Sequence, residues 1–237
     1  MLTWENEIKQ IEDPYYCTIA YERFLQKHGC FVDGKEILDI GTGVGAAIHY
    51  FRQWHPGNRF VGVDYNPEKI RIAKELAKHN KLEGADFDVS DWMNLPESFV
   101  NRFDGVTSTH SLVCLQQIEP SLQKVFDLKP RWFSANALFF DGPLDVLIHI
   151  RDHDYPILKD DDPDGDFNIF SLPKSAEFCR QNGYEMTYEP FHPPQDIPKP
   201  KDGGRGTYTM KTEIHDRTQF SGPVFLPWYF VLAKKTE

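Results

Sequence analysis

Residues 36–51 read "EILDIGTGVGAAIHYF", and this stretch decides the fold of the chain. A short apolar run at 36–40 ends in a loop with glycines at Gly41, Gly43 and Gly45, and a helix pattern follows through Phe51. Glycines allow a tight turn and let backbone amides approach a ligand without a Cβ in the way. Strand, glycine loop and helix in this order predict a cofactor site at the carboxyl end of the strand.

The segments after this loop continue to alternate between strand and helix patterns. Strands are predicted at 59–66, 85–92, 102–110 and 136–144, and helices at 67–80 and from about Glu119 to Trp132. Later, 174–191 reads as a helix followed by a strand, 207–214 alternates like a strand, and 224–235 is an apolar final strand interrupted by Pro227. Repeated β-α-β units predict an α/β fold with a doubly wound, mostly parallel, seven-stranded sheet and helices on both faces.

We expect one domain over residues 1–237, because 237 residues can form a single well-cored unit and no linker or internal repeat is visible. Residues 1–30 have a helical periodicity that Pro14 interrupts, and they predict an N-terminal lid that shuts water out of the site. Residues 36–145 form the predicted cofactor-binding core. Residues 146–237 are predicted to hold substrate-facing insertions, after strands five and six, and the C-terminal strands.

Composition narrows the classes of partner. The formal net charge of -10 argues against general binding of nucleic acid or of anionic membranes, since both require a basic face. The four cysteines are far apart, and the sequence shows neither a charged-then-apolar leader nor an apolar run of membrane-spanning length. These features predict a reduced, cytoplasmic protein.

Carboxylates after the first three predicted strands indicate the class of ligand. Asp39 precedes the first glycine by two residues, where its charge would repel a pyrophosphate and attract an ammonium group. Asp64 follows Gly45 by 19 residues and is placed to accept both hydroxyls of a ribose. Asp91 suits an exocyclic adenine amine, and Trp92 offers a ring face. Together they favour a cationic, phosphate-free adenosyl ligand, which S-adenosylmethionine is.

Other interpretations remain open for each acid. The loop also satisfies a dinucleotide fingerprint in its GxGxxA form. Each of the three aspartates could instead serve only its own turn or the next helix. Asp88 is an alternative to Asp91, depending on where the third strand ends.

Four motifs together resemble those of the class I S-adenosylmethionine-dependent methyltransferases: "LDIGTGVG", "VGVDYNP", "DVSDW" and "FDGVTSTHSL". The resemblance covers about residues 36–145, and the C-terminal segment is similar to bacterial small-molecule methyltransferases of polysaccharide or natural-product pathways. It implies S-adenosylmethionine as cofactor and a small hydroxyl- or amine-bearing acceptor, such as a sugar or a phosphorylated precursor. The cofactor-binding residues that it implies are Asp39, Gly41, Thr42, Gly43, Gly45, Asp64, Tyr65, Asp91, Trp92 and Thr109.

Histidines near the strand ends are the candidate catalytic residues. Methyl transfer to a hydroxyl or amine releases a proton, and a histidine with an ordinary pKa near about 6.5 can receive it at neutral pH. His110 follows the fourth strand and ranks first, while His149 and His153 follow the fifth. Each could equally be a histidine hydrogen-bonded into its loop.

The acidic segment "DDDPDGDFNIFS" matches only the start of a calcium loop, because Ser171 stands where the closing acid belongs and Pro163 interrupts. We therefore predict a solvated or substrate-facing loop and no metal. Two functional alternatives remain: an NAD(P)-dependent oxidoreductase on the same sheet, which Asp39 disfavours, and a non-catalytic S-adenosylmethionine-binding protein.

Overall fold

The computed structural model describes residues 5–151, 164–198, 207–213, 215–221 and 228–236. Its centre is one mixed sheet with the strand order β3-β2-β1-β4-β5-β12-β9, and a short β8 pairs with β5 beside this path. The strands of this sheet are β1 (Glu36–Ile40), β2 (Arg59–Asp64), β3 (Ala85–Val89), β4 (Gly105–Thr109), β5 (Trp132–Phe140), β8 (Phe170–Ser171), β9 (Tyr184–Pro190) and β12 (Trp228–Lys235).

Strands β1 to β5 pair in parallel, while β12 runs antiparallel to both of its neighbours. From β1, successive strands are added on one side as far as β3, and from β4 they are added on the other side. This change of direction between β1 and β4 creates the crevice at which ligands bind in such sheets. The predicted fold class, a doubly wound and mostly parallel seven-stranded sheet, is confirmed by this arrangement.

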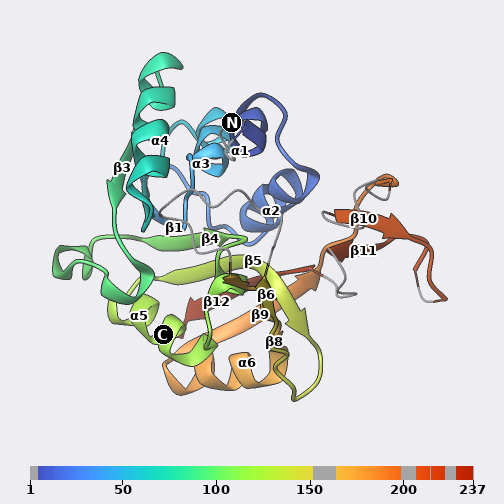
Figure 1. Cartoon of the computed structure of the whole chain (residues 1–237). Helices are drawn as coiled ribbons and strands as arrows, with labels where there is room; N and C mark the ends of the chain where they lie inside the picture. Colours follow the sequence, from blue (N-terminus) through green and yellow to red (C-terminus); the bar gives the residue numbers. More distant parts are fainter. Residues whose placement is uncertain (1–4, 152–163, 199–206, 214, 222–227, 237) are drawn as a thin grey trace.

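Helices cover both faces of the sheet, as Figure 1 shows. The helices on one side are α1 (Glu5–Glu12), α2 (Tyr16–Lys27), α3 (Ala46–Trp54) and α4 (Pro67–His79), and those on the other are α5 (Ile118–Asp127) and α6 (Leu172–Gln181). Local chemistry fixes where they begin. The Asn66 side chain accepts hydrogen bonds from the first-turn amides of α4, directly before Pro67, and Ser171 caps α6 in the same way.

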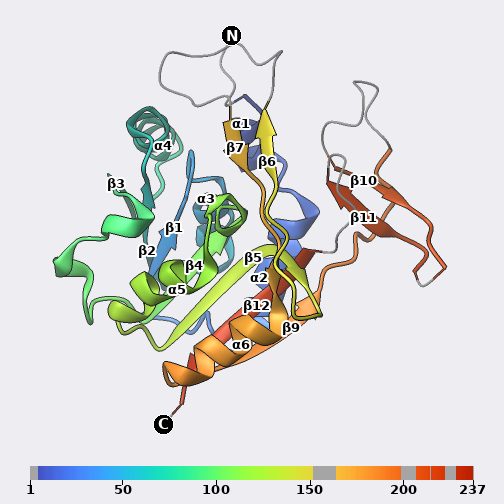
Figure 2. The same ribbon diagram turned by 60° about the horizontal axis from the view of Figure 1, so that its bottom comes forward.

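Two hairpins extend from the carboxyl-terminal half of the chain. β6 (His149–Arg151) pairs with β7 (Asp164–Asp166) in the insertion after β5, and β10 (Thr207–Met210) pairs with β11 (Thr218–Ser221) after β9. Figures 1 and 2 show the second hairpin standing to one side of the main sheet. The predicted insertions after the fifth and sixth strands are thus present. Pro227 lies outside the described residues.

The boundary between α5 and β5 differs from the prediction. The helix expected to run to Trp132 ends at Asp127, and Trp132 is already the first residue of β5, which begins before the predicted Asn136. Lys129 has a φ of +58° and Pro130 follows it. A left-handed residue and a proline each prevent the helix from continuing, so the chain turns directly into the buried strand β5.

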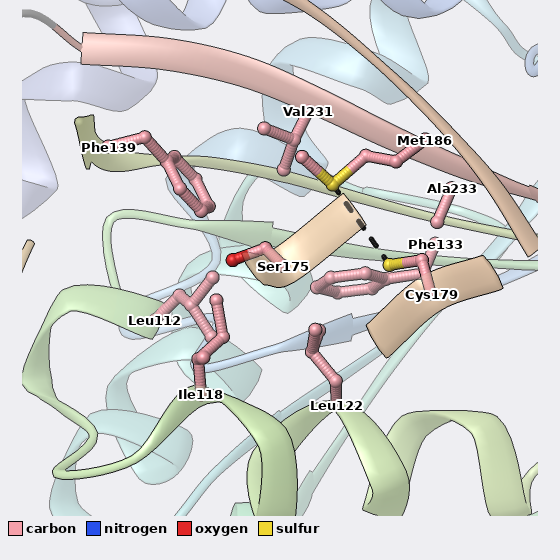
Figure 3. A pocket seen from close by; sticks show the side chains of 10 residues that line it. All are labelled: Leu112, Ile118, Leu122, Phe133, Phe139, Ser175, Cys179, Met186, Val231 and Ala233. Carbon is pink, nitrogen blue, oxygen red and sulfur yellow. Dashed lines mark hydrogen bonds between the residues drawn. The ribbon is translucent and has the colours of Figure 1, made fainter. Parts of the chain in front are cut away.

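The core beneath α5 and α6 is apolar and nearly filled. A small cavity there is lined by side chains from α5, α6 and the sheet, among them Leu122, Phe133 and Val231 (Figure 3). Cys179 Sγ lies 4.0 Å from Met186 Sδ at its edge. Because this face of the sheet is opposite to α3, the cavity belongs to the core packing and not to the glycine loop.

Candidate active site

The glycine loop joins β1 to α3 in the predicted form. Gly41, Gly43 and Gly45 have φ values of +74°, +58° and +81°, a region that side chains with a Cβ rarely adopt. A Cβ on Gly45 would also stand 2.6 Å from the buried ring of Phe87, whereas a Cβ on Gly43 would meet only the end of the flexible Glu7 side chain. Conformation therefore favours glycine at all three positions, and space requires it at Gly45.

Asp39 is buried at the end of β1, with an exposed fraction of 1%. Thr107 Oγ1 donates a hydrogen bond to Asp39 Oδ1 at 2.8 Å. Burial raises the pKa of Asp39 to about 6, against the lowering effect of hydrogen bonds from Thr107 and Thr42, and the nearby charge of Asp64 raises it further. A buried carboxylate held only by neutral hydroxyls is one that a cationic ligand group would stabilise.

Asp64 ends β2 and is also buried. Its Oδ2 accepts a hydrogen bond from Gly43 N at 2.9 Å and its Oδ1 accepts one from Asn66 N at 3.0 Å. Each carboxylate oxygen has two lone pairs, so both oxygens can accept another hydrogen bond from a ribose hydroxyl. Tyr65 follows with a largely exposed ring. The structure thus brings Asp39, Asp64 and the glycine loop together.

The residues predicted to meet the adenine are placed differently. Asp91 lies just beyond β3 and caps a 3₁₀ turn, accepting hydrogen bonds from Met93 N and Asn94 Nδ2 at 3.0 Å each. Asp88 lies within β3 and is exposed, so the end of the strand at Val89 favours Asp91 as the candidate.

Trp92 is a core residue in the structure. It is 6% exposed, its Nε1–H donates to Ser121 O on α5 at 2.9 Å, and its ring stands edge-on to Phe133 on β5. Its position follows from the packing of α5 onto the sheet. These contacts do not support the predicted role of Trp92 as an open ring face for adenine.

His110 lies at the end of β4 with a φ of +64°, and its backbone N–H donates to Asn136 O at 3.0 Å. The ring atom Nε2 is 3.0 Å from Asn136 Nδ2 and 3.4 Å from Cys17 Sγ. Burial lowers the pKa of His110 to about 4, so the ring is uncharged at neutral pH. Thr109 Oγ1, next to it, is buried without a hydrogen-bond partner among the described residues.

Two of these neighbours were missed by sequence reasoning. Asn136 is a fully buried amide in the apolar strand "FSANALFF", and a buried amide requires hydrogen-bond partners, so its position was a usable signal. Cys17 gave no such signal. The sequence favoured a small buried hydrophobe at each cysteine, and nothing in it places α2 beside the end of β4.

The other two candidate catalytic histidines, His149 and His153, follow β5 in the sequence. His149 is exposed on β6, and its Nδ1 lies 3.3 Å from Asp166 Oδ1 on β7. His153 and the aspartates at 160 and 162 are outside the described residues. Within the described ranges, no group of three or more His, Cys, Asp or Glu side chains is placed to hold a metal ion.

Helix α1 lies directly on the glycine loop, which the sequence did not reveal. Ile8 packs against a small buried cluster of Val44 and Ile72, from the loop and from α4. The Glu7 carboxylate forms an ion pair with Lys69 of α4 at 3.0 Å. Burial lowers the pKa of Lys69, but the charges of Glu7 and Asp64 outweigh this effect, and the net result is a raised pKa. A third carboxylate therefore faces this loop.

Comparison with known proteins identifies this arrangement. Residues 31–132 match a family model described as a methyltransferase domain. These residues form a methyltransferase domain. The match includes the glycine loop, Asp64 and His110, and it agrees with the methyltransferase family predicted from the sequence.

Curated relatives of the methyltransferase domain act on varied substrates. The chain is 33% identical over 76 residues to the release factor glutamine methyltransferase of Aliivibrio fischeri, covering 32% of this chain and 26% of that protein. It is 33% identical over 100 residues to the erythromycin 3''-O-methyltransferase of Saccharopolyspora erythraea, covering 41% of this chain and 32% of that protein. The chain thus spans about a quarter to a third of the length of these relatives.

Solved structures share the fold over most of the chain. The YcgJ protein of Bacillus subtilis superposes with a TM-score of 0.61 at 15% identity, covering 92% of this chain and 99% of that one. The magnesium protoporphyrin IX methyltransferase of Synechocystis, solved with bound S-adenosylhomocysteine, superposes with a TM-score of 0.57 at 12% identity, covering 92% and 82% of the two chains. At these identities, the likeness concerns the fold.

The residues of the methyltransferase domain fit S-adenosylmethionine, the cofactor of this family. Asp39 is a buried carboxylate without a cationic partner in its hydrogen bonds, and Asp64 keeps acceptor capacity on both oxygens. The loop between them needs glycine by conformation and space. An ammonium group, a ribose and a close backbone approach are what these three features accommodate.

Proposed function

We propose that the protein transfers the methyl group of S-adenosylmethionine to a small-molecule acceptor that carries a hydroxyl or an amine. The observation that carries this proposal is the pairing of Asp39 and Asp64 across the glycine loop, both nearly inaccessible to water. Asp39 has no cationic partner in its hydrogen bonds and would repel a pyrophosphate, whereas the ion pair with Lys69 offsets the charge of Glu7. Asp39 therefore favours a cationic adenosyl ligand over a dinucleotide, and Asp64 suits the ribose of either ligand.

In this proposal, Asp39 and the loop residues from Gly41 to Gly45 hold the methionine part, Asp64 accepts from the ribose hydroxyls, and Tyr65 and Asp91 face the adenine. The bound cofactor supplies an electrophilic methyl group on a sulfonium. Thr109 and His110 lie at the end of β4, on the side where this site opens. Their placement beside the strand end makes them the candidates for contact with the acceptor.

His110 would receive the proton that the acceptor loses. Its pKa of about 4 keeps the ring unprotonated throughout the neutral range, but it also makes His110 a weaker base than the ordinary histidine that the sequence predicted. His149 and His153 follow β5 in the sequence, and we assign them to acceptor binding. The α1 and α2 helices would cover the site, since α1 already contacts the glycine loop and α2 brings Cys17 to His110.

The names of the relatives support a small acceptor with oxygen or nitrogen as the methylated atom. One is an erythromycin 3''-O-methyltransferase, and another, 30% identical over 93 residues, is the ajmaline N-methyltransferase of Rauvolfia serpentina. A sugar or a phosphorylated precursor remains the acceptor class that we propose. Among the described residues, no helix is long and apolar enough to cross a membrane.

The proposal is tested by incubating the full chain with S-adenosylmethionine labelled in its methyl group and with pools of small hydroxyl- and amine-bearing metabolites. We expect label to appear in a small molecule, together with S-adenosylhomocysteine. Tight binding of the cofactor without transfer to any pool would instead favour the non-catalytic binding protein. The Asp64→Ala variant provides the background signal.

A further inference from the structure

Two elements, α2 and β5, bring side chains to one ring nitrogen of His110. Cys17 comes from α2 and lies 3.4 Å from Nε2, and Asn136 comes from β5 with its Nδ2 3.0 Å from the same atom. An amide Nδ2 is only a donor, and a thiol is a weak donor. Because Nε2 receives these donors, it carries the lone pair, and a neutral ring then has its proton on Nδ1.

The cluster is uncharged. Burial lowers the pKa of His110 to about 4 and raises the pKa of Cys17 to about 11, although hydrogen bonds from Thr18 and Asn136 oppose the second effect. Tyr15 directly precedes α2, and burial, Cys17 and Glu7 raise its pKa. At neutral pH the ring of His110, the thiol of Cys17 and the phenol of Tyr15 are therefore all uncharged.

Asn136 has a hydrogen-bond acceptor that its described neighbours do not use. Its side chain is fully buried, and Oδ1 has no hydrogen-bond partner among the described residues. A half-turn of the amide about its last bond exchanges Nδ2 and Oδ1. The same residue can therefore donate to a neutral ring and accept from a protonated one, which neither a leucine nor a carboxylate could do.

We propose that Asn136 and Cys17 are positioning residues for His110, holding the neutral ring with its proton on Nδ1 and its lone pair on Nε2. This rests on the proposed function, in which the acceptor's O–H or N–H bond breaks and its proton moves to Nε2. The electron pair of that bond forms the new bond to the methyl carbon, while the carbon–sulfur bond leaves its pair on sulfur. Asn136 then turns Oδ1 toward the protonated ring, and the proton passes to water.

The unprotonated Nε2 has a single lone pair, so it cannot receive the acceptor's proton while Asn136 Nδ2 still donates to it. The acceptor's O–H or N–H therefore displaces both the thiol and the amide N–H from Nε2 as it binds. The thiol is the weaker and more distant of the two donors, so it contributes less to the orientation of the ring before the acceptor arrives. Loss of Asn136 should disturb both the ring and turnover, whereas loss of the Cys17 thiol should lower kcat/KM for the acceptor modestly.

The ring itself is observed by ¹⁵N NMR of the histidine-labelled protein with S-adenosylhomocysteine bound and no acceptor present. We expect His110 to show the Nδ1-protonated neutral form down to about pH 5. Asn136→Asp should raise the pKa of His110 by about 1–3 units, since a carboxylate beside the ring favours its charged form. Ser134→Ala is the matched control, because Ser134 is equally buried on β5 and bonds Val231 O instead.

A His110 signal with its proton on Nε2, or one that ignores Asn136→Asp in a folded protein, would overturn the proposal. If that variant does not fold, Cys17 provides the second test. Cys17→Ala should lower kcat/KM for the acceptor about five-fold, as for one hydrogen bond that orients the ring before the acceptor binds, and leave the KM for cofactor unchanged, while Cys17→Ser restores kcat/KM. A serine variant as slow as the alanine variant refutes the role of Cys17. A parent with the expected ring form but no transfer to any acceptor contradicts the proposed function alone.

Discussion

Asp39 and Asp64 flank one glycine loop, but their hydrogen bonds give them different properties. Asp64 accepts hydrogen bonds from two backbone amides, Gly43 N and Asn66 N. Asp39 has hydroxyl partners, and burial raises its pKa to about 6. Asp64 is thus oriented by the backbone to accept from a neutral ribose, whereas Asp39 has no cationic partner in its hydrogen bonds.

Asp64→Ala should weaken S-adenosylmethionine binding by about 10²-fold or more, because each charge-assisted hydrogen bond to the ribose contributes roughly 1.5 to 3 kcal/mol. Calorimetry on the folded variant measures this. Asp86→Ala serves as the control, since Asp86 lies exposed on β3 in a loose pair with Arg59. Unchanged affinity in a folded Asp64→Ala protein would remove the ribose assignment.

Asp39→Asn should stabilise the cofactor-free fold at alkaline pH and at the same time weaken cofactor binding. The folded pKa of about 6 lies above the ordinary 3.8, so the stabilisation from the bound proton is fully present below about 3.8 and is lost as pH rises through about 6. At about pH 8 the cofactor-free variant should therefore unfold with a higher free energy, by up to about 3 kcal/mol. Denaturant titrations of parent and variant at about pH 5 and pH 8 test this sign.

The same residue should make cofactor affinity depend on pH. The ammonium group of the ligand favours the charged form of Asp39, so affinity in the parent should be full above about pH 6 and decline below it. Asp39→Asn should bind weakly at every pH. A parent whose affinity is flat from about pH 5 to pH 8 would contradict the contact between Asp39 and the ammonium.

His110→Ala should leave cofactor affinity within a few-fold and lower turnover by about 10² to 10⁴, the range for losing a general base. Because the pKa of His110 is about 4, turnover of the parent at saturating cofactor should not show a step near pH 6.5. His149→Ala is the comparison and should affect acceptor affinity more than turnover. Parent-like turnover of His110→Ala with a hydroxyl or amine acceptor would move the search to His149. An anionic acceptor needs no base, and the substitution would then cost little.

Helix α1 and the glycine loop form one unit through Ile8, Val44 and the Glu7 contact at Gly43. Gly43→Val should abolish cofactor binding, since its side chain would collide with Glu7 and occupy the ligand approach at a φ of +58°. Gly34→Val is matched for backbone strain, at a φ of +82° with no neighbour within 4 Å. It should lower stability and leave binding intact, as calorimetry and melting would show. Normal binding by Gly43→Val would place the site elsewhere.

The elements that the sequence predicted well are those with short-range signals. The glycine loop, the Asn66-Pro67 start of α4 and the apolar core of each parallel strand depend on residues within a few positions of one another. The prediction for the end of α5 was wrong because the apolar pattern continues from Phe126 to Trp132. Only Lys129 and Pro130 interrupt this pattern. The prediction placed Trp92 at the adenine because its burial could not be foreseen. That burial depends on α5, which comes from a distant part of the sequence and packs on Trp92.

At the scale of the whole molecule, the order of strands brings distant residues to one edge of the sheet. Asp39, Asp64 and His110 come from three different strand ends, and parallel pairing in register places these ends side by side. Sequence reasoning reached this because alternation fixes the topology. It did not reach Cys17, Asn136 or Glu7, since their roles depend on how α1, α2 and β5 pack in three dimensions.

The central claim is that the charges around the glycine loop select a cationic adenosyl cofactor. Calorimetry of the parent chain with S-adenosylmethionine, S-adenosylhomocysteine and NADH under one set of conditions tests it most directly. The account predicts that both adenosyl ligands bind and that NADH does not, because Asp39, which has no cationic partner in its hydrogen bonds, attracts an ammonium group and repels a pyrophosphate. Binding of NADH with an affinity equal to or above that of S-adenosylmethionine would contradict it.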